Sequence, residues 1–458
     1  MTNTNKATDQ TKNWQQQDAA HHLHPFTSHP GLRERGVRMI TKAKGIYLED
    51  SDGNHILDAM AGLWCAQVGY GNEELVEAAA TSMRELSYYN AFFMTSNPYA
   101  TELAAKIAEK TPGDISQVLF ACSGSEAVDS AYKLIKYYWN LKGQANRKQF
   151  IAREGAYHGS TTVGASLSGL SGMHPQFDLP IAGIHHIGPT PNYYKFGEDL
   201  SEEAFTDVCV RSLEAKILEL GPENVAAFVG EPVMGAGGLM IPPKGYWPKI
   251  EAVCRRYGVL LWADEVITGW GRTGEWFGSQ YYGIKPDIIT MAKGLSSGYQ
   301  PISAVALGGD IAKMIAANND EMVHGFTYAG HPVACAVALK NIEILERDGL
   351  VGEKAQPRIE YFRKSIAALA DHPLVGEVRT IGMLGAIELK AENLTTDAAL
   401  DLGYKCREHC FNTGLIMRAV GDTMILCPPL VITNAEIDEL SKKARYALDL
   451  TAEEIGLS

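Results

Sequence analysis

Short apolar runs alternate with longer amphipathic stretches from about residue 117 to residue 302 of the chain. Runs of about five nearly continuous apolar residues are typical of strands that are buried on both faces. Such runs, with one more mixed example, are Gln117–Ala121, Gln149–Arg153, Ala226–Gly230, Val259–Ala263 and Asp287–Met291. Between the first two runs, Glu126–Asn140 carries its apolar residues on one face, as an amphipathic helix does. The alternation predicts an α/β fold with a central, mostly parallel sheet that is flanked by helices.

The two ends of the chain show shorter and more mixed patterns. Helical patterns such as Arg358–Ala370 and Asn434–Asp449 dominate the C-terminal part. We expect residues 1–70 and 346–458 to form one smaller α+β domain together, and residues 71–345 to form a large domain. The first 13 residues or so are rich in Asn, Thr and Gln and lack an apolar segment. We therefore expect a flexible tail there, and neither a signal peptide nor a transit peptide.

Composition narrows the range of partners. The chain has 458 residues, of which 46% are hydrophobic and 21% charged, and its formal net charge is −13. An acidic balance argues against nucleic acid or an anionic membrane as a partner, because both attract clustered Lys and Arg. No uncharged apolar run is long enough to span a bilayer. The eight cysteines form no CxxC pair, so we expect free thiols in a cytoplasmic protein.

Polar residues follow each of the five predicted strands. They are Ser123 to Glu126, Tyr157 to Gly159, Glu231, Asp264 and Lys293. In parallel α/β sheets, ligands bind at the carboxyl ends of the strands. Because these ends meet at one edge of a sheet, the sequence predicts that the five groups form a single site.

The first of these segments, Ser123-Gly124-Ser125-Glu126, has two compatible interpretations. A strand, a small flexible turn and a helix start present unpaired N–H groups, which suit a phosphate. Ser123 with Glu126 three residues later is also the pattern of a capping box. The cap side chains would then orient the turn that holds the anion.

Asp264 and Lys293 supply the candidate chemistry. A carboxylate at the end of an apolar strand is costly to bury unless it meets a cation, and a protonated pyridine ring is one such cation. The alternative for Asp264 is a cap for the following turn. Lys293 lies in a turn of small residues with no other charge from Ile288 to Gly309. A partly desolvated amine has a lowered pKa and forms an imine with an aldehyde, whereas an ordinary surface lysine does neither.

Other features of the sequence have competing interpretations. Gly269, Gly271 and Gly274 spell the GxGxxG pattern of dinucleotide-dependent oxidoreductases, but the residues after them do not open a long helix. His21, His22 and His24 lack metal-binding partners nearby in the sequence, so we expect an N-terminal docking segment and no metal site. The aromatic cluster is formed by Tyr88, Tyr89, Phe92 and Phe93, and suits the core or a dimer interface.

Together these motifs resemble the class III, fold-type I aminotransferases that depend on pyridoxal 5′-phosphate (PLP). The resemblance covers nearly the whole chain and is most specific over Leu260–Gly298. That stretch contains Asp-Glu-Val, then Gly-Arg-Thr-Gly, then Asp287, with the lysine six residues later in Lys-Gly-Leu-Ser-Ser-Gly. Further matches are Ser-Gly-Ser-Glu (123–126), Tyr-His-Gly (157–159), Gly-Glu-Pro (230–232) and Phe-Thr-Tyr-Ala-Gly-His-Pro (326–332). The resemblance implies a seven-stranded sheet in a large PLP-binding domain.

The resemblance also implies a role for each site residue. Lys293 would bind PLP covalently as an imine and then carry the proton, and Asp264 would pair with the ring nitrogen. Tyr157 would stack on one ring face and Val266 would lie against the other. The further cofactor-binding residues would be Ser123, Gly124, Ser125, His158 and Glu231, the first three of them at the phosphate. Thr327 would reach the phosphate of the neighbouring subunit, so a homodimer with shared active sites, or a tetramer, is expected.

Within the class, the chain is most similar to the ω-amino acid and amine:pyruvate transaminases. Phe26, Trp64, Phe92 and Tyr157 would line the substrate pocket, and Arg418 would be a mobile arginine that binds the acceptor carboxylate. One departure from the pattern is Ala329, where many relatives carry Ser. Met234, beside the pocket, leaves the preferred substrate size open.

The expected reaction is a ping-pong transamination. A small-molecule amine donor gives its amino group to the cofactor, and a keto acid, pyruvate, then takes it. The donor stays open among β-alanine, taurine, a polyamine and an aromatic amine. Rival reactions on the same frame are an α-ketoglutarate-dependent or decarboxylating one and an aminomutase. Rivals from other classes are the dinucleotide-dependent oxidoreductase and a non-catalytic dimeric binding protein.

Overall fold

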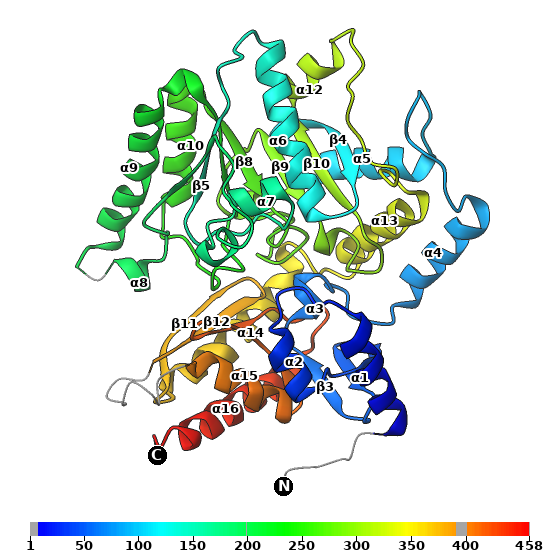
Figure 1. Ribbon diagram of the computed structural model, residues 1–458, viewed down its shortest axis with the longest axis vertical. Helices are drawn as coiled ribbons and strands as arrows, with labels where there is room; N and C mark the ends of the chain where they lie inside the picture. The colour runs from blue at the N-terminus through cyan, green and yellow to red at the C-terminus, as the bar shows by residue number, and fades with distance from the viewer. Residues whose placement is uncertain (1–7, 198, 391–400, 458) are drawn as a thin grey trace.

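The computed structural model describes residues 8–197, 199–390 and 401–457 and has a seven-stranded central sheet (Figure 1). The strands, in spatial order, are β4 (Ile115–Ala121), β10 (Ser303–Gly308), β9 (Ile288–Met291), β8 (Leu260–Asp264), β7 (Val225–Gly230), β5 (Gln149–Arg153) and β6 (Ile184–Ile187). β10 runs antiparallel to both of its neighbours, whereas β9, β8, β7, β5 and β6 pair in parallel. The prediction of a mostly parallel seven-stranded sheet is confirmed.

Helices cover both faces of this sheet because its strands are apolar on both sides. Every residue of β7, β8, β9 and β10 is buried. Within β8, Leu260 and Trp262 pack in the cluster that contains the apolar face of α6 (Gly124–Leu141), whereas Leu261 packs in the cluster of α9 (Glu202–Leu220) and α10 (Tyr246–Tyr257). Alternation along one strand therefore supplies both cores.

The remaining helices of the upper part lie around this sheet. α4 (Glu73–Glu85), α5 (Pro98–Lys110) and α13 (Pro332–Arg347) pack together, and α5 also packs on β4 (Figure 1). Shorter elements of the upper part are α7 (Thr162–Leu167), α8 (Tyr193–Phe196), α11 (Gly278–Tyr281), α12 (Gly309–Ala316) and the 3-10 turns η1 (Ser171–Met173), η2 (Pro222–Asn224) and η3 (Lys293–Leu295). Those of the lower part are α3 (Ala61–Trp64), η4 (Glu353–Ala355) and η5 (Ala368–Asp371).

The lower part of Figure 1 joins the two ends of the chain. One sheet has the order β1 (Ile40–Lys44), β2 (Tyr47–Asp50), β3 (His55–Asp58) and β13 (Leu415–Ile416), and β13 pairs with β3 in parallel. A second sheet has the order β11 (Val375–Ile381), β12 (Leu384–Leu389), β15 (Thr423–Leu426) and β14 (Arg418–Val420). The helices there are α14 (Gln356–Ala367), α15 (Leu402–Asn412) and α16 (Asn434–Glu454). The domain limits at residues 70 and 345 stay a prediction.

The N-terminal segment differs from the expected flexible tail. Residues 1–7 lie outside the described residues, but α1 (Asp9–His21) is helical and is followed by α2 (His29–Arg35). Thr8 caps α1, because its side chain accepts a hydrogen bond from the backbone N–H of Thr11. The Thr11 hydroxyl contacts Ser51 at 2.9 Å and Asp52 at 3.1 Å. These contacts dock the helix on the turn after β2, so the prediction was wrong for residues 9–13.

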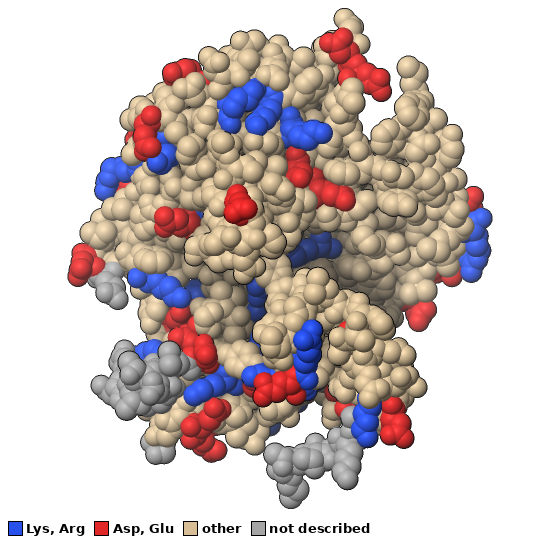
Figure 2. Space-filling model, viewed as in Figure 1, with Lys and Arg blue, Asp and Glu red and all other residues tan. Residues whose placement is uncertain are grey.

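The surface in Figure 2 carries Lys and Arg interspersed with Asp and Glu. No continuous basic stripe crosses this face among the residues drawn in colour, which agrees with the net charge of −13. Over the described ranges, the model contains no helix with the length and apolarity that a bilayer crossing requires.

Candidate active site

The carboxyl ends of the parallel strands surround a cavity of about 310 Å³, a size in the range of small-molecule sites. Its walls combine residues from the ends of β4, β5, β7, β8 and β9, as the sequence predicted. The predicted site residues that line it are Ser123, Gly124, Ser125, Tyr157, His158, Glu231, Asp264, Val266 and Lys293. The chain thus brings these segments to one place, although they are spread over the middle of the sequence.

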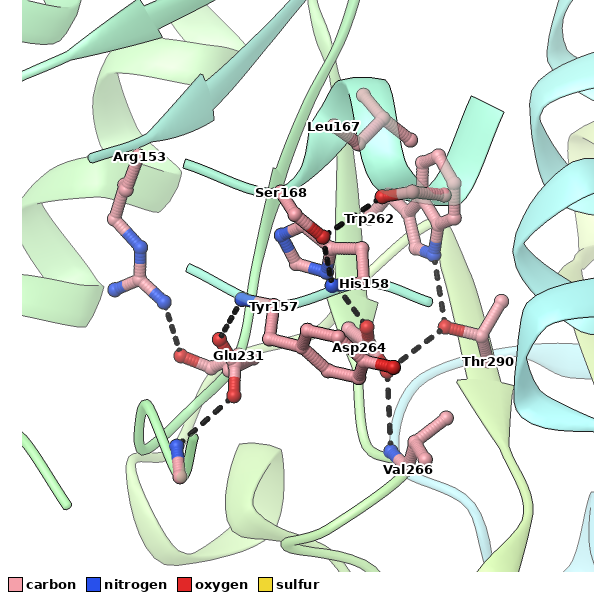
Figure 3. Close-up of polar contacts among 12 residues, drawn as sticks. Arg153, Tyr157, His158, Leu167, Ser168, Glu231, Trp262, Asp264, Val266 and Thr290 are labelled. Carbon is pink, nitrogen blue, oxygen red and sulfur yellow. Dashed lines mark hydrogen bonds and ion pairs between the residues drawn. The ribbon is translucent and has the colours of Figure 1, made fainter. Parts of the chain in front are cut away.

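Asp264 ends β8 as a buried carboxylate, 3% exposed, with hydrogen bonds to both of its oxygens (Figure 3). Oδ2 lies 2.6 Å from His158 Nδ1, and Oδ1 accepts from the Val266 backbone N–H at 3.2 Å and the Thr290 hydroxyl at 3.3 Å. The contact requires a proton on His158 Nδ1 when Asp264 is ionised. These contacts give both oxygens of the buried carboxylate hydrogen-bond partners and fix its orientation at the cavity.

Lys293 follows β9 and opens the turn η3. Its backbone has φ +43°, a left-handed conformation that a lysine rarely adopts and that is frequent at functional sites. Burial lowers the pKa of the Lys293 amine, and the Asp264 carboxylate opposes this effect by raising it. In the part of the chain that the structure describes, no hydrogen bond or ion pair holds the amine. A half-buried amine of lowered pKa that has no such partner is suited to act as a nucleophile and as a base.

The start of α6 has the expected cap. Ser123 accepts from the Glu126 N–H at 3.2 Å, and the Glu126 carboxylate accepts from the Cys122 N–H at 2.7 Å. These bonds fix the first helical turn, at which Gly124 and Ser125 lie. The free N–H groups of a first turn and the positive end of the helix form an anion site. The Ser123 cap is therefore observed, and phosphate binding by this turn stays a prediction that the same geometry allows.

Gly159 brings a second loop close to this turn. A Cβ atom added to Gly159, whose φ is +128°, would lie 2.7 Å from the Ser125 hydroxyl oxygen. That same hydroxyl accepts from the Ser160 N–H at 3.0 Å. A side chain at position 159 would fill the cradle, so the two loops leave room for a phosphate-sized anion only because residue 159 is glycine.

Glu231 holds the Tyr157 loop in place (Figure 3). Its two carboxylate oxygens accept from the backbone N–H groups of Tyr157 at 3.0 Å and Gly235 at 2.9 Å. Its carbonyl accepts from the buried Arg153 guanidinium at 2.5 Å. Burial raises the pKa of Glu231. The carboxylate is therefore engaged in orienting the backbone beside the cavity.

Two predicted substrate residues lie close to the cavity without lining it. The Phe26 ring is 6.3 Å from the Tyr157 ring, edge to face, and its side chain is exposed. Arg418 is half-buried at the start of β14, and burial lowers the pKa of its guanidinium, whereas Tyr157 raises it. No described carboxylate pairs with Arg418. The arginine is thus a cation near the site without a fixed counter-charge among the described residues.

The other three predicted residues are not among those that line the cavity. Trp64 is 1% exposed and packs in an apolar cluster with residues of β12 and β15, and its indole N–H has no partner in the described chain. Phe92 is half-buried against Gly325. Thr327 is exposed, and its carbonyl accepts from the Tyr88 hydroxyl at 2.7 Å. Their roles in binding stay predictions.

Sequence reasoning missed several residues of the cavity wall. They are Cys122, Ile267, Ala292, Ser296, Gly298, Gln300, Pro301 and Ile302. Ser296 and Gln300 lie in the same uncharged loop as Lys293, and the Ser296 hydroxyl donates to the Gln300 carbonyl at 2.6 Å. Their position within a few residues of the lysine was the available signal.

The glycine run at residues 269–274 does not form a dinucleotide site. A Cβ added to Gly271 would meet Leu430 at 2.7 Å, and one added to Gly274 would meet Ile359 at 2.9 Å. The run therefore packs against the C-terminal part of the chain. The next helix, α11, has four residues and starts only at Gly278, so no long helix presents its N-terminus to a pyrophosphate.

Comparison with known proteins gives consistent matches. The family model "Aminotransferase class-III" matches residues 32–448. A putrescine–pyruvate aminotransferase from Pseudomonas aeruginosa is 52% identical, with 96% of this chain and 97% of the relative covered. A diaminobutyrate–2-oxoglutarate transaminase from Halomonas elongata is 41% identical, with 90% of each chain covered. The crystal structure of an omega transaminase from Pseudomonas jessenii in complex with PMP has a TM-score of 0.93 and 42% identity, with 97% of this chain and 99% of that chain covered.

Proposed function

The chain belongs to the class-III aminotransferases, which are PLP-dependent enzymes, and we propose that it moves an amino group from a primary amine to pyruvate, with an aliphatic diamine as the preferred donor. The preference is supported by the 52% identity to a putrescine–pyruvate aminotransferase over almost the whole chain. The single observation that carries the chemistry is that Lys293 and Asp264 line the same cavity. PLP, when bound, supplies an electron sink that stabilises negative charge on the donor carbon.

Lys293 has two tasks in this proposal. Its amine would hold the cofactor covalently, because burial leaves a larger unprotonated fraction than a surface lysine has. As a free amine, Lys293 would also be the base that takes the proton from the donor carbon. The absence of another partner among the described residues leaves the amine free to move between these positions.

Asp264 and His158 act as a unit. Asp264 lines the cavity, and the 2.6 Å contact with His158 Nδ1 orients its carboxylate. Asp264 would pair with the cofactor ring nitrogen, and Gly124 and Ser125 at the start of α6 would hold the phosphate. Glu231 holds the backbone N–H of Tyr157, whose ring would lie against the cofactor.

The substrate side must accept two different partners in turn. Pyruvate carries a carboxylate, so it requires a cation, whereas a donor amine requires room beside that cation. Arg418 suits this alternation, because its guanidinium lies near Tyr157 and has no described carboxylate as a fixed partner. A planar guanidinium binds a carboxylate through two parallel hydrogen bonds. Phe26 covers the same side through its contact with Tyr157.

A donor panel tests the proposal. Purified holoenzyme is given pyruvate with putrescine, β-alanine, taurine or an aromatic amine, and the alanine formed is measured. We expect putrescine to have the highest kcat/KM. A preference for 2-oxoglutarate over pyruvate, or released CO₂, would favour a rival reaction of the same family. A colourless protein without a visible absorption band that borohydride fixes onto Lys293 would contradict PLP chemistry altogether.

The swinging role of Arg418 is tested in the separate half-reactions. We expect Arg418→Ala to lose turnover with pyruvate by about 10²-fold and turnover with an apolar amine by less than about tenfold, because a charged hydrogen bond is lost only with the keto acid. Arg358→Ala is the matched control, since Arg358 is also half-buried, with a pKa that burial lowers. Equal losses in both half-reactions of the Arg418 variant would contradict the proposal that Arg418 binds only the keto acid.

We also propose that the enzyme is a homodimer whose active sites are shared. The support is an exposed apolar surface, called here the 88–94 patch, which comprises Tyr88, Tyr89, Phe93, Met94, Val323 and Tyr328. Tyr88 joins its two segments through a ring contact of 5.8 Å with Tyr328 and the hydrogen bond to Thr327. A large exposed apolar patch marks an interaction site. Thr327 lies within the patch beside Tyr88, and we propose that it binds the phosphate of the partner's cofactor.

The cytoplasm is the compartment that we propose for this enzyme. All eight cysteines are free, and six of them are buried. Free thiols in this number suit a reducing compartment.

A further inference from the structure

Asp18, His22 and His24 converge at the end of α1, outside the active site. Asp18 lies one helical turn before His22, and His24 folds back over the helix end. His22 Nδ1 is 3.1 Å from Asp18 Oδ1, and His24 Nε2 is 2.8 Å from Asp18 Oδ2. The two imidazole rings are 4.1 Å apart. One ligand atom from each of the three side chains lies within 4.8 Å of the other two.

Two imidazole nitrogens and one carboxylate oxygen form a donor set that zinc prefers. In a tetrahedral site with bonds of about 2.0–2.1 Å, neighbouring ligand atoms are about 3.3 Å apart. Both imidazole nitrogens are close to that distance from one oxygen, since Asp18 Oδ1 is 3.1 Å from His22 Nδ1 and 3.0 Å from His24 Nε2. The side chains of Asp18 and His24 are 12% and 19% exposed, whereas that of His22 is 61% exposed. The open side leaves space for a water ligand in the fourth position.

The sequence interpretation of these histidines as a plain docking segment rested on the lack of a further ligand nearby. The structure shows that this further ligand is Asp18. His22 and His24 both contact its carboxylate, because the chain after α1 folds back toward the helix end. We propose that Asp18, His22 and His24 bind one Zn²⁺ ion per chain.

The place of this site in the fold indicates what the ion does. His24 is followed after one residue by Phe26, whose ring contacts Tyr157 at the cavity. Phe26 has φ +48°, a conformation that the neighbouring chain must hold in place. An ion bound by His24 and by the end of α1 anchors the chain on one side of Phe26. The metal site is therefore structural, and it stiffens the segment that covers the substrate side.

Calorimetric titration of the untagged, EDTA-treated holoenzyme with ZnCl₂ tests the site. We expect one ion per chain with a Kd in the micromolar range or below, and a higher Tm when Zn²⁺ is added. His24→Gln and Asp18→Asn should each weaken binding by at least about tenfold. His21→Gln is the matched control, since His21 is the adjacent exposed histidine of α1 and belongs to no cluster of ligands in the described chain.

Co²⁺ provides a second readout, because a site with two imidazoles and a carboxylate gives visible absorption bands that the His24 variant should lose. Variants whose metal-free Tm equals that of the parent are folded, so weakened binding then reports on the site itself. Absent stoichiometric binding in the parent overturns the proposal. Equal affinity in His24→Gln, Asp18→Asn and the parent overturns it as well. Neither result bears on transamination, which is measured separately.

Discussion

At the scale of single residues, the Asp264 carboxylate and the Lys293 amine lie at the same cavity in opposite surroundings. Asp264 has one oxygen on His158 Nδ1 and the other on Val266 and Thr290, so its ionised form is solvated by the protein. The Lys293 amine, in contrast, has no such partner among the described residues and is destabilised as a cation by burial. The cavity thus combines a carboxylate with several hydrogen-bond partners at the end of β8 and an amine of lowered pKa in the turn after β9.

Replacing Asp264 with Asn tests the anion. We expect kcat to fall by about 10²-fold or more, because a neutral amide does not keep the cofactor ring nitrogen protonated. Steady-state assays with pyruvate measure the change. Thr290→Val removes the weaker, 3.3 Å contact to the same carboxylate and should cost less than about tenfold. An Asp264→Asn enzyme with nearly parental kcat would show that the carboxylate has another role.

The pH dependence of cofactor attachment tests Lys293. Burial lowers the pKa of the Lys293 amine, so attachment of PLP to the apoenzyme should rise with pH and level off below the value of about 10.4 that is normal for lysine. The Asp264 charge raises that pKa, so its loss in Asp264→Asn should move the profile to lower pH. Stopped-flow absorbance of the apoenzyme follows the rate. A profile that moves to higher pH would contradict this arrangement.

At the scale of elements, the site depends on how α6 and the loop after β5 approach each other. The Ser123 cap fixes the start of α6, and Gly159 permits the loop to lie on Ser125. The helix supplies the partial positive charge, and the loop supplies the shape. Neither element alone makes a phosphate site.

Gly159→Ala should therefore weaken PLP binding to the apoenzyme by at least about tenfold, because alanine at φ +128° is strained and its Cβ meets the Ser125 hydroxyl. Fluorescence titration of the apoenzyme with PLP measures the Kd. In Gly172→Ala, by comparison, the added Cβ has no neighbour within 4 Å and should leave the Kd unchanged. An unchanged Kd in the Gly159 variant would place the phosphate elsewhere.

The sequence predicted most of the sheet because burial on both faces leaves a readable apolar run. β5 has the predicted limits, β8 begins and ends one residue later than predicted, and β9 begins one residue later. β10 runs antiparallel, which its apolar run does not reveal, since the same residues suit either direction. β6 contains His185 and His186, both half-buried, so it does not read as a buried strand.

The candidate site was predictable to a similar extent. The strand ends gave Asp264 and Lys293, because their neighbours in sequence are apolar. The contact between His158 and Asp264 joins the loop after β5 to the end of β8, so it can be recognised only from the tertiary structure. The positions of Trp64 and Arg418 relative to the cavity depend on how the terminal segments pack, which local patterns do not encode. The ligand missed at the N-terminus was readable, since Asp18 precedes His22 by one helical turn.

At the scale of the whole molecule, the large sheet and the terminal segments contribute different residues to the active site. The large sheet carries the groups for the cofactor, whereas Phe26 and Arg418 come from the terminal segments. The 88–94 patch leaves a further face apolar and exposed, with Phe93 84% exposed. In a monomer this apolar face would be exposed to water, which is unfavourable in free energy, and association would bury it.

Met94→Asp should shift the protein from dimer toward monomer and lower its specific activity on dilution, because a charge would be buried at the interface. Light scattering after size exclusion measures the molar mass. Leu218→Asp is the control, because Leu218 is an exposed apolar residue on α9, on the opposite side of Figure 1 from α4 and α5. A Met94→Asp protein that stays dimeric would place the interface on another face.

The pairing of β3 with β13 decides how late in synthesis the terminal sheet can be completed. Leu57 and Leu415 are partners in parallel strands, so the edge of β3 stays unpaired until the ribosome has made the C-terminal residues. At about 5–20 residues per second, that wait is on the order of tens of seconds. Throughout it the nascent N-terminal hairpin presents an open strand edge, where chaperones or other unfinished chains can bind before the native partner emerges.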